Sequence, residues 1–548
     1  MNRFKNALRS FGIPGIIVIL QYAAVVLFNF LYTDNAIDSD TAKLLRHSVE
    51  MGRNHTLNIP EWIHTTTMEW DTSALLSAPI YSLTHNIYLS TAVSNTVITA
   101  LLICLIIRLF DRFGLSIKTA LKSCTLLLIP YAFGMLDYYN LLMFGGAQYV
   151  FRIMIPILLL CILKTSVDKR IGIENILLSV LAVILILIAS VSSGLYITVS
   201  CVLPVAALVV FDALMYGKRE KYGFLVAGAA FVVSAIGSII SIRSGEASFG
   251  NGMSLLRWYD LRYYIDCVAE GFFRLMGAMP GAVQDESIAV FSARGIAFLF
   301  KLLIALTLIP VLVSGCRHVL FAGKKDPDPV LTDREQGAGN AFDPGDDIRF
   351  WLCGIALINF IIVAVCETRY SSLNSTLEYR YLLPVTVPLL LCCVPQIEVW
   401  QNGWSKTFRK VLWAVLTAGL VYTTCICYTD AHNSLDPYAY CNDIIAYAED
   451  SGYDTVIFLD DRVSAECCRI MDMSREYEAY SSNGCMDIVD YYAAAEYSDF
   501  YNDRHLLFAV TGTSLADTIG SDKAMLYTYR DSILWFDIYE AQEFALGF

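Results

Sequence analysis

Long apolar runs separated by short polar segments fill the first 428 residues of the chain. Each run is close to the length of about 20 residues that an α-helix needs to cross the hydrocarbon core of a bilayer. We therefore predict eleven membrane-spanning helices, over residues 13–32, 87–107, 119–136, 150–164, 173–192, 195–214, 223–242, 295–314, 350–366, 381–400 and 411–428. The composition agrees, because 56% of the 548 residues are hydrophobic and only 17% are charged, which is more apolar than soluble domains. The predicted fold is a polytopic α-helical membrane protein, with residues 1–428 as its transmembrane domain.

Basic residues are concentrated in alternate segments between the predicted spans. They occur at Arg3/Lys5/Arg9, Arg108/Arg112/Lys118/Lys122, Lys164/Lys169/Arg170, Lys218/Arg219/Lys221, Lys324/Lys325 and Lys406/Arg409/Lys410. Segments rich in lysine and arginine stay in the cytoplasm, so the N-terminus is predicted to be cytoplasmic in a multi-pass protein of the cell membrane. An odd number of spans places the C-terminal residues outside the cytoplasm, together with two long loops at residues 33–86 and 243–294.

Residues 429–548 differ from the rest of the chain in charge and in pattern. From Asp430 onward there are 23 acidic and 6 basic residues, a net charge of −17, so the preceding residues carry +4 of the total of −13. Such an acidic segment repels phosphate groups, which excludes a nucleic acid as its partner. Strand-like runs such as DTVIFLD alternate with helical patterns such as DRVSAECCRIMD. We predict a small extracytoplasmic α/β domain here.

Acidic residues are prominent in the first long outer loop. Asp38 and Asp40 open a predicted amphipathic helix at the membrane surface, and Glu69 and Asp71 precede a second predicted helix. Plain helix caps explain such positions, but four converging carboxylates could also act as a general base on a hydroxyl. Asp38 and Asp40 are also candidate ligands of a divalent cation such as Mg²⁺ or Mn²⁺. Asp137, at the outer end of the third predicted span, is a solvated cap or faces the same cavity.

Arginine and aromatic residues occur in the other outer segments. Arg380 and Tyr381 stand at the mouth of the tenth predicted span. There an arginine can bind a lipid phosphate, or simply reach the interface beside a tyrosine. The loop at residues 243–294 is rich in aromatic residues, which indicates an interfacial belt or a wall that stacks against sugars. In the second case Arg257 and Arg262 would contact a phosphate or pyrophosphate group.

Three short motifs resemble those of a known enzyme family. They are DSD at residues 38–40, MEWD at residues 68–71 and RYLLPVTVP at residues 380–388. With these motifs the membrane part is similar to the GT-C glycosyltransferases, multi-pass enzymes that use polyprenyl-phosphate-linked sugars, in particular those of the mannosyl- and aminoarabinosyltransferase type. The proline pair usual after the second acidic motif is absent in EWDTSALLSAP. Glu69 and Asp71 therefore both remain candidates for the matching residue.

The resemblance implies a glycosyl transfer in the cell envelope, on the extracytoplasmic side of the membrane. The donor would be a polyprenyl-phosphate-linked sugar held among the spans and membrane lipids, and the acceptor a glycan, lipid or protein hydroxyl. Asp38 or Asp40 would take the acceptor's proton in an inverting reaction. Glu69 or Asp71 would position the acceptor or share a cation. Arg380 would stabilise the departing lipid phosphate, and no nucleotide is required.

Other classes of membrane protein fit parts of the same pattern. A polysaccharide polymerase or ligase would also bind lipid phosphates, but through a large loop rich in arginine and histidine. A transporter would bury ionisable groups in mid-span and often shows repeated halves. A non-enzymatic scaffold for the acidic domain would not depend on the acidic residues of the first loop, so substitution of those residues separates it from an enzyme.

Overall fold

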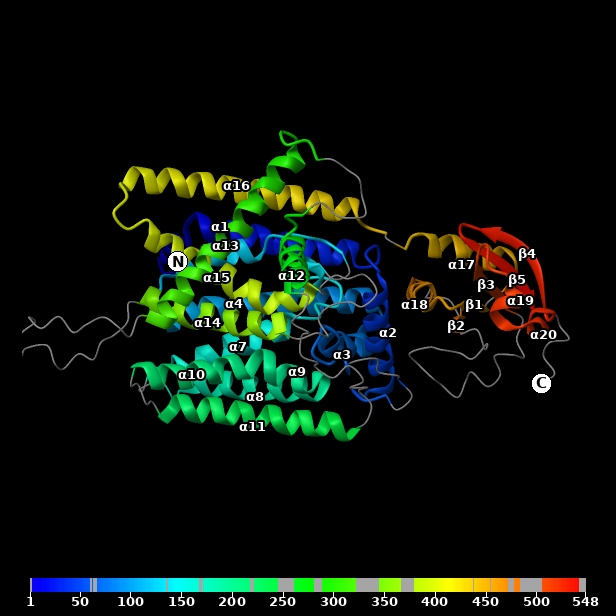
Figure 1. The fold of residues 1–548 in the computed structure, drawn as a ribbon, viewed down its shortest axis with the longest axis horizontal. Coiled ribbons are helices and arrows are strands. Elements are labelled where there is room, and N and C mark those ends of the chain that lie inside the picture. The colour runs from blue at the N-terminus through cyan, green and yellow to red at the C-terminus, as the bar shows by residue number, and fades with distance from the viewer. Residues whose placement is uncertain are drawn as a thin grey trace, which may run out of the picture. The chain divides into compact units, whose positions relative to one another are not determined.

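Figure 1 shows the computed structural model of the chain. It describes residues 2–541. Within this range, residues 60–61, 63–66, 135–136, 167–169, 171, 217–220, 245–260, 280–287, 322–343, 366–378, 437, 454, 472–477 and 483–504 are not described. The chain folds into two compact units. The first contains residues 1–27, 67–72 and 95–433, and the second contains residues 28–66, 73–94 and 434–548.

Long apolar helices dominate the structure. In the described part of the chain, nine helical segments are long and apolar enough to cross a membrane. They belong to α1 (Asn2–Tyr32), α4 (Ile87–Arg112), α8 (Ile173–Ser193), α9 with η2 and α10 (Leu195–Ile197, Thr198–Val202, Leu203–Tyr216), α11 (Lys221–Ser244), α13 (Ala293–Phe321), α14 (Pro344–Val365), η6 with α15 (Tyr379–Leu382, Leu383–Trp400) and α16 (Lys406–Asn433). The multi-pass helical fold expected from the sequence is confirmed, whereas the number eleven stays a prediction.

Two of the predicted spans correspond to shorter helices. α5 (Ile117–Leu127) covers only the first part of the third predicted span. It ends before Pro130, because proline lacks a backbone N–H and disfavours the helical conformation of the residue before it. Residues 128–134 are not helical, and the next helix is α6 (Tyr138–Leu142). α7 (Val150–Leu163) is buried along nearly its whole length, so it lies inside the first unit.

The second unit contains a mixed sheet and several short helices. Its helices are α2 (Ser39–Asn54), α3 (Ala74–Thr84), α17 (Tyr440–Asp450), α18 (Arg462–Met471), α19 (Leu515–Ile519) and α20 (Ser521–Ala524). Its strands are β1 (Thr455–Leu459), β2 (Glu478–Ser482), β3 (Leu506–Val510), β4 (Tyr527–Ile533) and β5 (Phe536–Ala541), in the order β2-β1-β3-β5-β4. β1 is parallel to β2 and β3, and β5 is antiparallel to β3 and β4. The small α/β fold predicted for the C-terminal residues is confirmed.

The core of the second unit combines the first outer loop with the C-terminal residues. Leu45 and Val49 of α2 are buried in one cluster with Phe458 of β1 and Phe508 of β3. A buried ion pair adds to this contact, since the Nη1 of Arg46 lies 2.8 Å from a carboxylate oxygen of Glu466 in α18. The apolar face of α2, predicted to lie on the membrane surface, instead packs against the α/β domain.

Candidate active site

The segment Thr67–Thr72, which carries the second acidic motif, is held against the end of α8. The backbone N–H of Met68 donates to the carbonyl oxygen of Ser192 over 3.0 Å, and that of Trp70 donates to the Ser192 hydroxyl over 3.0 Å. α8 ends at Gly194, whose backbone angles (φ 57°, ψ −138°) favour glycine. The helix therefore stops here and presents the hydroxyl groups of its last turn to the segment.

Asp71 is anchored by three partners. Its side chain is buried, and its carboxylate accepts hydrogen bonds from the hydroxyls of Ser192 over 2.7 Å and Ser193 over 2.8 Å. The Nε of Arg152 in α7 completes an ion pair at 3.2 Å. Charges persist inside proteins when they are paired and hydrogen-bonded in this way. Asp71 thus fixes the first outer loop to α7 and α8.

Arg152 also contacts two aromatic rings. Its guanidinium lies 4.2 Å from the ring centroid of Tyr149 and 4.6 Å from that of Tyr196. Cation–π attraction at this range adds to the ion pair with Asp71. Arg152 is not among the site residues predicted from the sequence. The signal was present, because an arginine within an apolar run is rare and usually marks a functional position.

The 3₁₀ turn η6 brings the late motif to the same cluster. The ring of Tyr381 lies 6.2 Å from that of Tyr149 and 5.8 Å from that of Tyr196. The guanidinium of Arg380 lies 5.3 Å from the centroid of the Tyr381 ring. Two segments far apart in the sequence, residues 67–72 and η6, are therefore linked within the first unit through Arg152 and the rings of Tyr149 and Tyr196.

Asp137 contacts the same turn. The hydroxyl of Tyr379 donates to the Oδ1 of Asp137 over 3.0 Å, and the guanidinium of Arg274, at the end of α12 (Leu261–Leu275), lies 5.1 Å from the Tyr379 ring. Burial raises the pKa of the Asp137 carboxyl above its ordinary value of 3.8, although the Tyr379 hydrogen bond and the charges of Arg274 and Lys301 oppose the rise. A carboxylate with a raised pKa is a stronger proton acceptor than an ordinary one.

Asp137→Asn is expected to stabilise the protein more at neutral pH than at acidic pH. Because the pKa of Asp137 is higher in the folded state, ionisation costs more there than in the unfolded chain. The stability of the natural protein therefore falls as the pH rises from about 3.8 towards the folded pKa. The variant lacks this ionisation, yet its amide oxygen can still accept from Tyr379. The difference in melting temperature between variant and natural protein should grow as the pH rises above about 4 and level off above the folded pKa, and a constant difference would contradict the raised pKa.

Glu69 has an unusual backbone conformation. Its φ is +62°, in the left-handed region that non-glycine residues seldom adopt, and its side chain is buried. The hydroxyl of Thr72 donates to the carbonyl oxygen of Glu69 over 2.6 Å and closes the turn. Such strain, about 1–3 kcal/mol, persists where the surrounding structure imposes it and is frequent at functional sites. The motif thus holds two different carboxylates, Asp71 in an ion pair and Glu69 on a strained turn.

The other residues predicted from the sequence belong to other parts of the chain. Asp38 and Asp40 belong to the second unit, where the Oδ1 of Asp38 accepts the N–H of Thr41 over 2.8 Å as the cap of α2 and Asp40 lies in the first turn. The backbone of Arg262 lies in α12, whereas its side chain and the whole of Arg257 lie outside the described residues. Among the residues that the structure describes, no group of three or more histidines, cysteines, aspartates or glutamates could hold a metal ion. The divalent cation stays a prediction.

An apolar groove of about 400 Å³ is lined in part by α12, which carries Arg274, and by α15, which follows η6 directly. Its walls come from α12, α13, α14 and α15, and include Phe272, Phe273, Leu308, Leu312, Val385 and Leu389. Arg274 directly follows Phe273 in α12, and Val385 lies in the first turn of α15, directly after η6. The groove is therefore suited to a long hydrocarbon chain whose polar end lies at Arg274 and η6.

The fold is shared with ArnT from Cupriavidus metallidurans. The structure of ArnT bound to undecaprenyl phosphate matches with a TM-score of 0.54 and 12% sequence identity, over 95% of this chain and 97% of that chain. The structure of the same protein in the apo state matches with a TM-score of 0.53 and 12% identity, over 96% and 98%. No protein-family model and no curated protein matches the chain. The GT-C fold expected from the three sequence motifs is confirmed.

Proposed function

We propose that the chain is a membrane glycosyltransferase that moves a sugar from a polyprenyl-phosphate donor to an acceptor hydroxyl on the extracytoplasmic side. The observation that carries this proposal is the cluster around η6. One turn joins Arg274, Arg380, a set of tyrosine rings and the carboxylate of Asp137 next to an apolar groove. The fold supports it as well, since one structure of ArnT with this fold is bound to undecaprenyl phosphate.

The donor binds through its phosphate and its hydrocarbon chain. Arg380 and Arg274 contact neighbouring tyrosines of η6, and a guanidinium can donate two parallel hydrogen bonds to a phosphate. The isoprenoid chain continues into the groove lined by Phe272 and Phe273. Tyr381, packed against the rings that stack on Arg152, keeps the turn in place. Further phosphate contacts from Arg257 and Arg262 remain part of the proposal.

The transfer inverts the anomeric configuration of the sugar. Asp38 or Asp40 accepts the proton of the acceptor hydroxyl while the hydroxyl oxygen forms a bond to the anomeric carbon. On the opposite side, the bond from that carbon to the phosphate oxygen breaks, and its electron pair leaves with the lipid phosphate. Arg380 stabilises the negative charge that develops there, which is the role of a preorganised donor in such reactions.

Glu69 and Asp71 take different roles in this scheme. Asp71 is engaged by Arg152 and two serine hydroxyls, so it positions the loop and does not accept the substrate proton. Glu69, two residues earlier on the strained turn, positions the acceptor or shares a divalent cation. We propose this division for the two residues between which the sequence left the choice open.

Arg380→Ala is expected to lower the turnover of a polyprenyl-phosphate sugar by about 10²–10³-fold, because it removes a donor to the leaving phosphate. Arg380→Lys should be intermediate, since it keeps the charge but loses the paired hydrogen bonds. The measurement is the release of polyprenyl phosphate by the purified full-length protein, supplied with a panel of polyprenyl-phosphate-linked sugars and acceptors.

Arg53→Ala is the control, because Arg53 is an exposed arginine whose side chain pairs only with its helical neighbour Glu50 among the ion pairs of the described residues. It should leave turnover unchanged. Consumption of a donor by the natural protein together with full activity of Arg380→Ala would contradict the phosphate role of Arg380. Failure to consume any donor in the panel would contradict the proposed function itself.

A further inference from the structure

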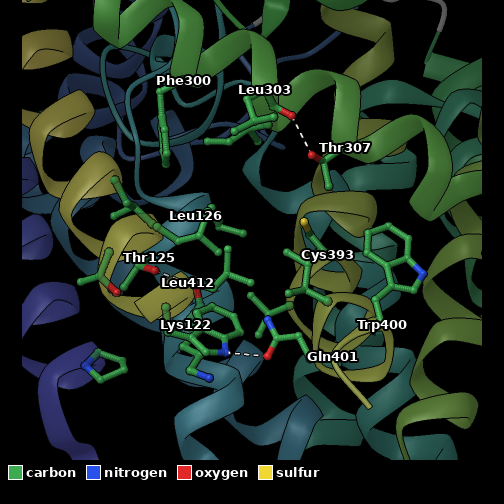
Figure 2. Close-up of a pocket in the computed structure, with 18 of the residues that line it drawn as sticks. Lys122, Thr125, Leu126, Phe300, Leu303, Thr307, Cys393, Trp400, Gln401 and Leu412 are labelled. Atoms are coloured by element: carbon green, nitrogen blue, oxygen red, sulfur yellow. Dashed lines mark hydrogen bonds between the residues drawn. The ribbon is translucent and has the colours of Figure 1, made fainter. Parts of the chain in front are cut away.

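A cavity of about 280 Å³ lies between α1, α5, α13, α15 and α16 in the first unit (Figure 2). Most of its wall is apolar, with Leu126 of α5 among the residues that face it. Figure 2 shows Phe300 and Leu303 at one end of the cavity and Lys122 and Gln401 at the opposite end. The cavity thus has an apolar body and a polar end. This arrangement matches a membrane lipid, which has an apolar chain and a polar headgroup.

Charged and aromatic groups form the polar end. The Nζ of Lys122 lies 2.9 Å from the Oε1 of Glu398 and 3.6 Å from the ring centroid of Trp413. The indole N–H of Trp413 donates to the Oε1 of Gln401 over 3.0 Å. Trp400 lines the same end and is 39% exposed. Tryptophan and lysine gather where a bilayer meets water, so this end belongs at the membrane surface and the body of the cavity extends into the hydrocarbon.

The surroundings of the polar end are basic. α16 begins at Lys406 and carries Arg409 and Lys410 directly afterwards, and α5 carries Lys118 in its first turn. The N-terminus of a helix adds a partial positive charge of its own. Segments with this composition lie on the cytoplasmic side of a membrane. An anionic headgroup in the cytoplasmic leaflet is therefore attracted to this end more strongly than a zwitterionic one.

We propose that this cavity binds one acyl chain of an anionic glycerophospholipid from the cytoplasmic leaflet, with the lipid phosphate held by the basic residues at the start of α16. The site goes beyond the proposed glycosyl transfer and is separate from the donor groove. The groove uses Val385 and Leu389 near the start of α15, whereas the cavity uses Cys393 and Ile397 towards its end. The apolar wall contacts the acyl chain, and Lys406, Arg409 and Lys410 neutralise the headgroup.

Native mass spectrometry of the purified full-length protein tests this site. In an equal mixture of phosphatidylglycerol and phosphatidylcholine, the natural protein is expected to retain phosphatidylglycerol preferentially. Leu416→Trp fills the cavity and should lower this retention by about tenfold or more, because several methylene groups lose their buried position. Thr307→Phe fills it from α13 and is the second variant. Val415→Trp is the matched control, since Val415 is 61% exposed on the same helix.

The headgroup is tested by the triple variant Lys406→Gln, Arg409→Gln, Lys410→Gln. It should lower the preference for phosphatidylglycerol by about tenfold or more, because each basic side chain near an anionic lipid contributes a factor of about five. Melting temperatures verify that every variant is folded. If a folded cavity-filling variant retained as much phosphatidylglycerol as the natural protein, the proposal that the cavity binds this lipid would be wrong. Equal binding of the two phospholipids would overturn the anionic preference, and displacement of both by polyprenyl phosphate would overturn the assigned occupant.

Discussion

Asp38→Asn should lower glycosyl transfer by about 10²–10⁴-fold, the usual contribution of a general base, and leave the melting temperature unchanged. Asparagine caps a helix as well as aspartate does. The backbone N–H of Thr41, now 2.8 Å from the Oδ1 of Asp38, therefore keeps its acceptor. The negative charge is lost, and with it the proton acceptor that the reaction needs. The release of polyprenyl phosphate and the melting temperature of the purified protein are the two measurements.

Two further variants decide which carboxylate acts. Asp40→Asn tests the other residue of the motif, and Asp34→Asn is the control because Asp34 is an exposed acidic residue shortly before it. A loss of activity in one variant alone assigns the base to that residue. Full activity in both Asp38→Asn and Asp40→Asn would reject both residues as the base. Asp137→Asn in the same assay then tests whether the carboxylate next to η6 accepts the proton.

Arg152→Met is expected to lower the free energy of unfolding by about 3–5 kcal/mol, the usual effect of removing one partner from a buried ion pair. The carboxylate of Asp71 would stay buried beside Ser192 and Ser193 without its cation. The stacked contacts of the guanidinium with Tyr149 and Tyr196 would be lost as well. Thermal and denaturant unfolding of the purified protein in bilayer discs measures the effect.

The double variant Arg152→Met, Asp71→Asn should recover part of this loss, because no charge is then left unpaired and the asparagine oxygen still accepts a serine hydroxyl. Arg294→Met is the control, since Arg294 forms an exposed ion pair with Asp430 at 2.7 Å. Such surface pairs contribute about 0–1 kcal/mol. A loss in Arg152→Met no larger than in Arg294→Met would show that the buried pair does not hold the first outer loop.

The overall fold could be predicted from the sequence because the chain spans a bilayer. A bilayer demands long apolar helices, because backbone groups in hydrocarbon must bond within their own helix. The same rule fails between residues 128 and 134, where the apolar run continues but the helix has ended before Pro130. Hydropathy counts apolar side chains and is insensitive to a missing backbone N–H. The helix that follows Asp38 was predicted from its amphipathic pattern. Its packing partner was not predicted, because an apolar face does not reveal whether lipid or protein covers it.

Part of the candidate site was also visible in the sequence. Short motifs next to apolar runs identified four candidate site residues: Glu69, Asp71, Arg380 and Tyr381. Arg152 and Arg274 were not singled out. Arg274 lies in an aromatic segment with two other arginines, and its contact with Tyr379 depends on the folded structure.

Hydropathy and charge along the chain were sufficient for the membrane class, the helical architecture and the acidic α/β domain, because each depends on local composition summed over many residues. Three features depended on the folded structure: the pairing of Asp71 with Arg152, the raised pKa of Asp137 and the packing of Tyr381 against Tyr149 and Tyr196. These features arise from distances of a few ångströms between residues far apart in the chain, and from burial that no single segment specifies.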